Sequence, residues 1–227
     1  MSIKKSHHSV LFLGKKNDYY CSEAIKFTQK NFKKVQVDLS RWGDKLPEDI
    51  GFWDGDYIFS YLSRHKVPSY LLKKAKISAI NFHPGTPEYP GIGCNNFALY
   101  DNVKEYGVTC HYMSEVIDAG AIIDVKRFPV YQTDTVKSLL GRIYAFQLVL
   151  FYEIVGSILD NKPLPISKET WKRKAFTREE FDDLCEIKQD MSDIEVKKII
   201  RATSYNNYQP YCKINNFKFS LIPDSGN

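Results

Sequence analysis

The chain has 227 residues, 43% of them hydrophobic and 14% aromatic, which is enough to bury a core as one domain with a small extension. Its formal net charge of +5, from 32 basic and 27 acidic residues, is too small an excess to indicate a nucleic-acid-binding protein. No segment reaches the roughly 18 consecutive apolar residues of a membrane span, and the apolar stretch from Val10 to Leu13 is too short for a signal peptide. The composition therefore predicts a cytoplasmic globular protein with neither a membrane nor a nucleic-acid partner.

Strand and helix patterns alternate along the first two-thirds of the chain, and this order predicts an α/β fold with a mostly parallel sheet and helices on both faces. Helix starts are expected at Ser22, at Pro68 and at Thr133 or Asp134, because these residue types favour the first turn of a helix. The strands are expected at His8 to Gly14, Lys34 to Leu39, Asp56 to Leu62, Ile77 to Phe82, Gly107 to Met113 and Ala121 to Val130. The helices are expected at Ser22 to Phe32, Pro68 to Lys76, Asn95 to Tyr100 and about Asp134 to Leu159.

The composition changes at Asn161 to Pro165, where two prolines within three residues mark a boundary. Beyond it, Ser192 to Ala202 has the pattern of a capped helix, and Tyr211 to Ile222 has that of a β-hairpin. We therefore divide the chain into a domain over residues 1–162 and an extension over residues 163–227, made of a short helix and a hairpin.

Several kinds of site are excluded because their motifs are missing. The first strand is followed by a single glycine, Gly14, so the dinucleotide fingerprint G-x-G-x-x-G is absent, as are the P-loop and the G-x-S-x-G elbow. The histidines never have H-E-x-x-H spacing, and the five cysteines include no C-x-x-C pair. The sequence thus predicts no metal site and no disulfide framework.

The segment Asn81-Phe82-His83-Pro84-Gly85 is the most informative one, because it ends a predicted strand with two polar side chains. Alternation along the strand places Asn81 and His83 on the same side, and Asp118 lies in a turn between two later strands. An amide, an imidazole and a carboxylate suit acyl transfer: the amide donates to an oxyanion, the imidazole shuttles a proton or holds that charge, and the carboxylate orients the imidazole. From spacing alone, a reading of Asn81 and Asp118 as ordinary turn residues stays open.

The ordered set Asn81-x-His83-Pro84, a loop rich in proline and glycine, Gly107-Val108-Thr109 and Asp118-x-Gly120 resembles the folate-dependent formyltransferase family. The resemblance is good over about Val10 to Val130 and looser beyond it. It implies a Rossmann-like formyltransferase domain, 10-formyltetrahydrofolate as co-substrate, and Asn81, His83 and Asp118 as the catalytic set. The family's common Ser-Leu-Leu-Pro after His-Pro is replaced here by Gly85 to Gly91, which leaves the amine acceptor open.

The acceptor expected from this resemblance is an amino sugar. The loop Pro87 to Gly91 with Asn96 to Leu99 is most similar to bacterial nucleotide-sugar N-formyltransferases, which implies a substrate such as dTDP-4-amino-4,6-dideoxyglucose, used for the O-antigen of lipopolysaccharide. The resemblance also implies a homodimer built partly through the C-terminal extension. Three alternatives stay open: another amine acceptor such as glycinamide ribonucleotide, a formyltetrahydrofolate deformylase, and a non-catalytic folate- or nucleotide-binding regulator.

The chemistry requires a neutral amine, whereas alkylamines are mostly protonated near neutral pH, since lysine itself has a pKa of about 10.4. We expect His83 to accept the excess proton and then, with Asn81, to donate to the oxyanion. Asp118 is expected to stabilise the charged imidazole.

The remaining expected contacts are assigned by resemblance or by residue type. By resemblance the pterin lies beside the segment after the third strand and the turn before Asp118. The residues expected there are Arg64, His65, Val67 and Ile117. For the nucleotide sugar, Tyr89 or Trp171 could stack on a base, and Arg201 could pair with a pyrophosphate. His111 is interpreted as a packing residue.

Overall fold

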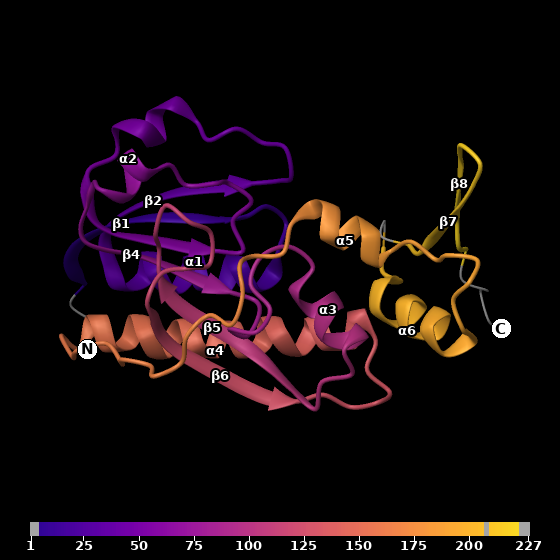
Figure 1. The fold of residues 1–227 in the computed structure, drawn as a ribbon. Helices are drawn as coiled ribbons and strands as arrows, with labels where there is room; N and C mark the ends of the chain where they lie inside the picture. The colour runs from indigo at the N-terminus through magenta and orange to yellow at the C-terminus, as the bar shows by residue number, and fades with distance from the viewer. Residues whose placement is uncertain (1–4, 207–208, 223–227) are drawn as a thin grey trace.

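The computed structural model describes residues 5–206 and 209–222, and its main body is a six-stranded sheet between two layers of helices (Figure 1). The strand order is β2-β1-β3-β4-β5-β6; β1 to β4 are parallel, and β5 runs antiparallel to both of its neighbours. The strands are β1 Ser6–Lys15, β2 Phe32–Ser40, β3 Gly55–Tyr61, β4 Ala75–His83, β5 Glu105–Tyr112 and β6 Ile122–Pro129. The helices are α1 Tyr19–Asn31, the 3-10 helix η1 Glu48–Phe52, α2 Ser69–Leu72, α3 Cys94–Tyr100, α4 Val136–Leu159, α5 Arg178–Leu184 and α6 Asp193–Thr203, and the hairpin is β7 Tyr211–Ile214 with β8 Phe217–Ser220. The predicted Rossmann-like fold is confirmed, including the C-terminal helix and hairpin.

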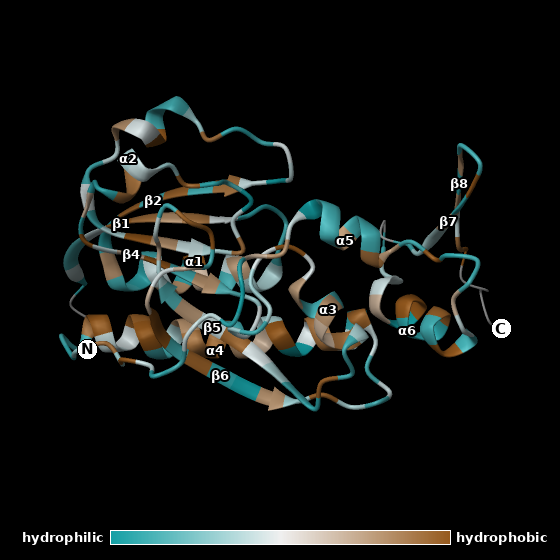
Figure 2. Cartoon of the chain, in the orientation of Figure 1, coloured by the Kyte–Doolittle hydropathy of each residue, from teal (hydrophilic) through white to brown (hydrophobic). Residues whose placement is uncertain are grey.

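The strands bury both of their faces, as strands in a layered α/β protein do. In β1, Val10 and Phe12 face the core under α1 and α4, whereas Leu11 and Leu13 face the smaller core under η1 and α2. The helix α4 is apolar along most of its length (Figure 2). Its length and composition alone would also suit a membrane span, but its buried side chains pack against the sheet, so the core accounts for its apolar character.

Two helices begin at residues other than those the sequence pattern predicts. The N-cap of α1 is Asp18, whose carboxylate accepts from the Cys21 amide at 3.0 Å, so the expected cap Ser22 lies inside the helix. The N-cap of α4 is Thr135, and not Thr133 or Asp134. The carboxylate of Asp134 is engaged elsewhere, because it accepts from the Tyr131 amide and pairs with Arg142.

The chain after residue 162 returns to the main body before it forms its own elements. The Lys172 amide donates to the Pro87 carbonyl at 3.0 Å, and the Phe176 amide donates to the Pro90 carbonyl at 2.9 Å. The helix α6 then packs on α3, and the hairpin extends away from the sheet (Figure 1). The division into residues 1–162 and 163–227 stays a prediction; its outer ends, 1–4 and 223–227, and residues 207–208 lie outside the described residues.

Gly120 should tolerate no side chain. A Cβ added there would lie 1.8 Å from the Tyr112 carbonyl oxygen, so the loop between β5 and β6 would have to shift. We expect Gly120→Ala to lower the free energy of unfolding by about 1–3 kcal/mol, as overpacking does. The matched control is Gly141→Ala in α4, where a Cβ meets nothing within 4 Å and helix propensity should add about 1 kcal/mol. Chemical unfolding measures both changes, and an unaltered Gly120→Ala protein would contradict the prediction.

Candidate active site

A cavity of about 340 Å³ opens where three loops meet at one edge of the sheet. The segment after β3, the end of β4 and the loop between β5 and β6 each contribute to its wall. The first two follow parallel strands, as the strand-end rule indicates, whereas the third follows the antiparallel strand β5. Its size falls within the range of small-molecule sites. Leu62, directly after β3, has a φ of 55°. This left-handed backbone conformation is strained for leucine, and such strained residues are found most often at ligand-binding and active sites.

The strand β4 presents Asn81 and His83 to this cavity. Alternation sends Ile80 and Phe82 into the core under α4, so Asn81 and His83 lie on the opposite face. His83 is 4% exposed, and Asn81 is half-buried. The predicted pair of side chains therefore does face one cavity.

Both ring nitrogens of His83 face acceptors. Nδ1 lies 3.2 Å from Asp118 Oδ2, and Nε2 lies 3.0 Å from the Tyr89 carbonyl oxygen. A carbonyl cannot donate, and neither can an ionised carboxylate, so the two contacts suit a ring with hydrogen on both nitrogens. The proton-accepting role expected for His83 stays a prediction.

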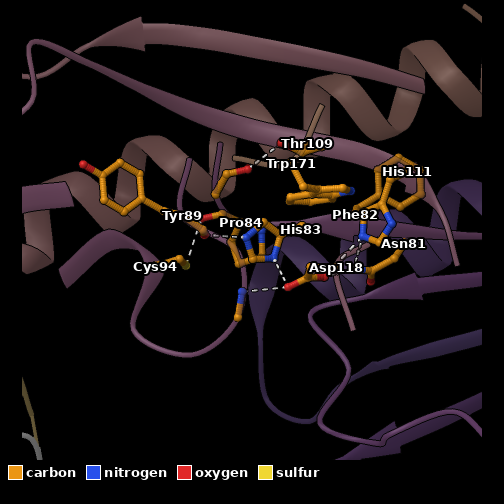
Figure 3. Close-up of polar contacts among 12 residues, drawn as sticks. Asn81, Phe82, His83, Pro84, Tyr89, Cys94, Thr109, His111, Asp118 and Trp171 are labelled. Atoms are coloured by element: carbon orange, nitrogen blue, oxygen red, sulfur yellow. Dashed lines mark hydrogen bonds and ion pairs between the residues drawn. The ribbon is translucent and has the colours of Figure 1, made fainter. Parts of the chain in front are cut away.

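Asp118 is the centre of the polar network (Figure 3). Its carboxylate accepts from the Gly91 amide at 2.8 Å and lies 3.2 Å from His83 Nδ1 and 3.3 Å from His111 Nε2. Burial by itself would raise the pKa of Asp118, but His83 and the hydrogen bond from the Gly91 amide hold it below its usual range. The site thus keeps a buried negative charge that four other groups, Asn81 included, surround.

Trp171 covers the two histidines from the segment after α4. Its indole meets His111 edge-on with ring centroids 5.0 Å apart, and His83 at 5.9 Å. Its Nε1 donates to the Gly120 carbonyl at 2.8 Å, which fixes the ring over the site. Figure 3 shows the indole beside His83 and His111. The indole therefore shields the ion pairs from water on this side.

The four residues expected to bind the cofactor all line the cavity. Val67 is buried, whereas Ile117 is 53% exposed at the rim. The guanidinium of Arg64 lies 4.4 Å from the centre of the Trp42 ring, and His65 Nε2 lies 2.8 Å from Asp38 Oδ2. Their roles toward folate stay predictions.

None of the three residues expected to bind the nucleotide sugar is among those that line the cavity, although Trp171 contacts both histidines. The Tyr89 hydroxyl donates to Asp101 at 2.8 Å and its ring stacks on Phe176, so it is the carbonyl of Tyr89 that reaches the reacting centre. The guanidinium of Arg201 donates to the carbonyls of Asp134 and Tyr131 and to the Asn102 side chain, which gives Arg201 a packing role.

The sequence interpretation assigned His111 to packing, yet its ring lines the cavity and contacts both Asn81 and Asp118. A usable signal was present. His111 follows the same alternation as Thr109 on a strand expected beside the catalytic one, and a buried histidine at such a place usually has a polar partner.

Replacing Asp118 by asparagine should destabilise the protein in a pH-dependent way. Because folding lowers the pKa of Asp118, its ionised form stabilises the folded state fully above the ordinary carboxyl pKa of about 3.9, and this contribution declines as the pH falls below that value. We expect Asp118→Asn to cost about 3 kcal/mol at neutral pH, as a broken buried pair does. Urea unfolding at several pH values should show that the difference in the free energy of unfolding between the variant and the wild type becomes smaller from about pH 5 to pH 3. A difference that is absent, or constant over that interval, would contradict the prediction.

Comparison with known proteins places this geometry in a family. Residues 63–155 match the family model described as formyl transferase. A GDP-perosamine N-formyltransferase of Brucella melitensis is 28% identical over 160 residues, which are 70% of this chain and 60% of the relative. The chain thus spans less than two-thirds of the length of that curated relative.

Solved structures share the fold over nearly the whole chain. A 4-N formyltransferase from Francisella tularensis superposes with a TM-score of 0.74 at 20% identity, covering 94% of this chain and 96% of that chain. An N-formyltransferase from Helicobacter canadensis, solved with folinic acid and dTDP-3-aminofucose, gives a TM-score of 0.72 at 22% identity, covering 92% of this chain and 84% of that chain. The segment that matches the formyl transferase model, residues 63–155, is the one that carries Asn81, His83 and Asp118.

Proposed function

We propose that the protein transfers a formyl group from 10-formyltetrahydrofolate to the amino group of a nucleotide-linked amino sugar. The observation that carries this proposal is the convergence of Asn81, His83 and Asp118 on one cavity within the matched domain. The cavity has apolar walls from Val67 and Ile117 beside this polar cluster, which suits a flat ring system with a reactive polar end. The names of the similar proteins support an amino-sugar acceptor.

The reaction joins the amine nitrogen to the formyl carbon and breaks the bond from that carbon to the folate nitrogen. The oxygen of the formyl group gains negative charge on the way. The half-buried amide of Asn81 can donate to this oxygen, and the positive charge of His83 lies close enough to stabilise it. Asp118 orients the His83 ring through the contact to Nδ1. The proton that the attacking amine loses ends on the folate nitrogen, which leaves as a neutral arylamine, so the reaction consumes no net acid or base.

The finer identity of the acceptor rests on the loop that follows His83. We propose dTDP-4-amino-4,6-dideoxyglucose as the substrate, a place in O-antigen biosynthesis for the product, and the cytoplasm as the location. Trp171, which is half-buried beside the site, stays the candidate for contact with the nucleotide sugar.

The first test measures tetrahydrofolate released from 10-formyltetrahydrofolate with and without dTDP-4-amino-4,6-dideoxyglucose, with the product mass determined in parallel. We expect release that depends on the sugar, together with the mass gain of one formyl group. Release without any sugar would replace the proposal with a deformylase. If there is no release with any of a panel of amino sugars, catalysis itself is refuted, and a binding protein remains.

Variants of the reacting centre should lose turnover and keep the fold. We expect Asn81→Ala and His83→Ala each to lower kcat by about 10²–10³-fold, the loss typical of one removed oxyanion donor. The control is His8→Ala, since His8 lies at the start of β1 and pairs with Asp56. Steady-state kinetics and thermal unfolding separate loss of activity from loss of structure, and near-wild-type rates in both variants would refute the catalytic assignment.

We also propose a homodimer through the C-terminal hairpin. Phe217 and Phe219 of β8 are 69% and 52% exposed, an unusual pair for the surface of a monomer. Light scattering should give about twice the chain mass of 26.3 kDa for the wild type and the monomer mass for Phe217→Asp combined with Phe219→Asp. The control Ile194→Asp changes an equally exposed apolar residue on α6 and should stay dimeric. A dimer in the double variant, or a monomeric wild type, would contradict the proposal.

A further inference from the structure

His111 is a buried titratable group that the proposed reaction does not use. It is 2% exposed, and it lies on β5 directly opposite Asn81 in the strand register. Its ring lines the cavity, so it belongs to the reacting centre and not to the core under α4. What it does there depends on which of its nitrogens carries a proton.

The hydrogen-bond partners of His111 determine its charge. Nδ1 lies 2.9 Å from the Tyr112 carbonyl oxygen, which can only accept, so Nδ1 carries a hydrogen. Nε2 has two neighbours: Asn81 Nδ2 at 3.0 Å, which can only donate, and Asp118 Oδ1 at 3.3 Å, which can only accept when ionised. The shorter contact is the hydrogen bond, so Nε2 presents its lone pair to Asn81. His111 is therefore uncharged, whereas His83, on the other side of Asp118, has acceptors at both nitrogens.

We propose that His111 is a positioning residue: its bare Nε2 accepts one hydrogen of the Asn81 amide and so decides which end of that amide faces the formyl oxygen. This inference rests on the proposed function, because it explains how Asn81 is presented for that reaction. The second hydrogen on Asn81 Nδ2 is held only weakly, since Asp118 Oδ1 is 3.5 Å away. That hydrogen can turn to the substrate while the first one anchors the amide.

A proton on Nε2 would reverse this arrangement. The new N–H needs an acceptor, so Asn81 would turn its carbonyl oxygen toward His111 and its donor away from the position it now holds. The charged groups that face His111 are Asp118 from the β5–β6 loop at 3.3 Å and, beyond it, His83 from β4. Trp171 covers the ring without adding charge, and Tyr112 contributes only a carbonyl. Asp118 already balances the charge of His83, which favours a neutral His111.

The first test is the proton state of the ligand-free protein. Nitrogen-15 spectra of histidine-labelled protein, assigned with His111→Gln and His83→Gln, should show hydrogen on Nδ1 and none on Nε2 for His111, and hydrogen on both nitrogens for His83. A charged His111, or one protonated on Nε2, would overturn the proposal. Because this measurement needs no substrate, it is independent of the identity of the acceptor and of the proposed reaction.

The second test is a double-mutant cycle on kcat and KM. His111→Leu removes the acceptor and should lower kcat by about 10–10²-fold with little change in KM, less than the loss for Asn81→Ala. His111→Gln keeps an acceptor for Asn81 and should restore most of the rate. In the Asn81→Ala background, His111→Leu should cause no further loss, because the group it positions is gone.

A merely structural role for His111 predicts a different pattern. Its losses would then add to those of Asn81→Ala, would appear in KM as well as kcat, and would follow thermal stability. Additive losses would overturn the proposal. If His111→Leu does not fold, the spectra and the comparison of His111→Gln with wild type still decide the question. His8→Gln carries the same substitution away from the cavity and should leave kcat and KM unchanged.

Discussion

The carboxylate of Asp118 accepts from a backbone amide of the loop after β4 and lies within ion-pair distance of histidines on two different strands. A buried charge is costly unless hydrogen bonds or opposite charges compensate it. The groups around Asp118 therefore lie where they can stabilise its carboxylate. The Gly91 amide fixes the loop, His83 lies beside the same carboxylate oxygen, and Asn81 lies near the other oxygen. The geometry of the reacting centre therefore follows from one residue in a turn, whose own φ of 46° is a conformation that aspartate tolerates better than most side chains.

Much of this centre could be predicted from the sequence, because strand alternation is a local rule. It correctly placed Asn81 and His83 on one face, and the strand-end rule correctly brought the segment after β3 to the same cavity. Asp118 follows the antiparallel strand β5, to which that rule does not apply. The roles of Tyr89 and Arg201 could not be predicted in this way, since they depend on which nearby acceptors compete for a hydroxyl or a guanidinium. Asp101 and three groups around the start of α4 provide those acceptors.

The missed elements have equally specific reasons. The helix α5 was not predicted, although Thr177 and Glu180 form a capping box at its start, because its seven residues have too little apolar periodicity to stand out. The start of α1 was placed at Ser22 because serine and aspartate are both good caps. Only the fold shows that Asp18 is the one whose carboxylate reaches the free amides. The proton states of the histidines need the partners of each nitrogen, which no sequence pattern encodes.

The extension after residue 162 takes part in the site and does not merely follow it. Lys172 and Phe176 bind the loop after His83 through backbone hydrogen bonds, and Trp171 covers both histidines. Gly91 lies so close to this segment that a Cβ there would be 2.5 Å from the Phe176 amide nitrogen. Residues on both sides of the proline-containing linker thus contribute to the same site.

The partner of His83 Nε2 is a main-chain carbonyl, and this has an evolutionary consequence. A substitution at position 89 changes the side chain but leaves the carbonyl in place, so the contact does not depend on residue type. The loop can therefore vary in sequence, as it does here where Gly85-Thr86-Pro87 replaces the more common family residues, while the reacting histidine keeps its acceptor. Sequence change in this loop can therefore proceed without removing the hydrogen-bond acceptor of His83.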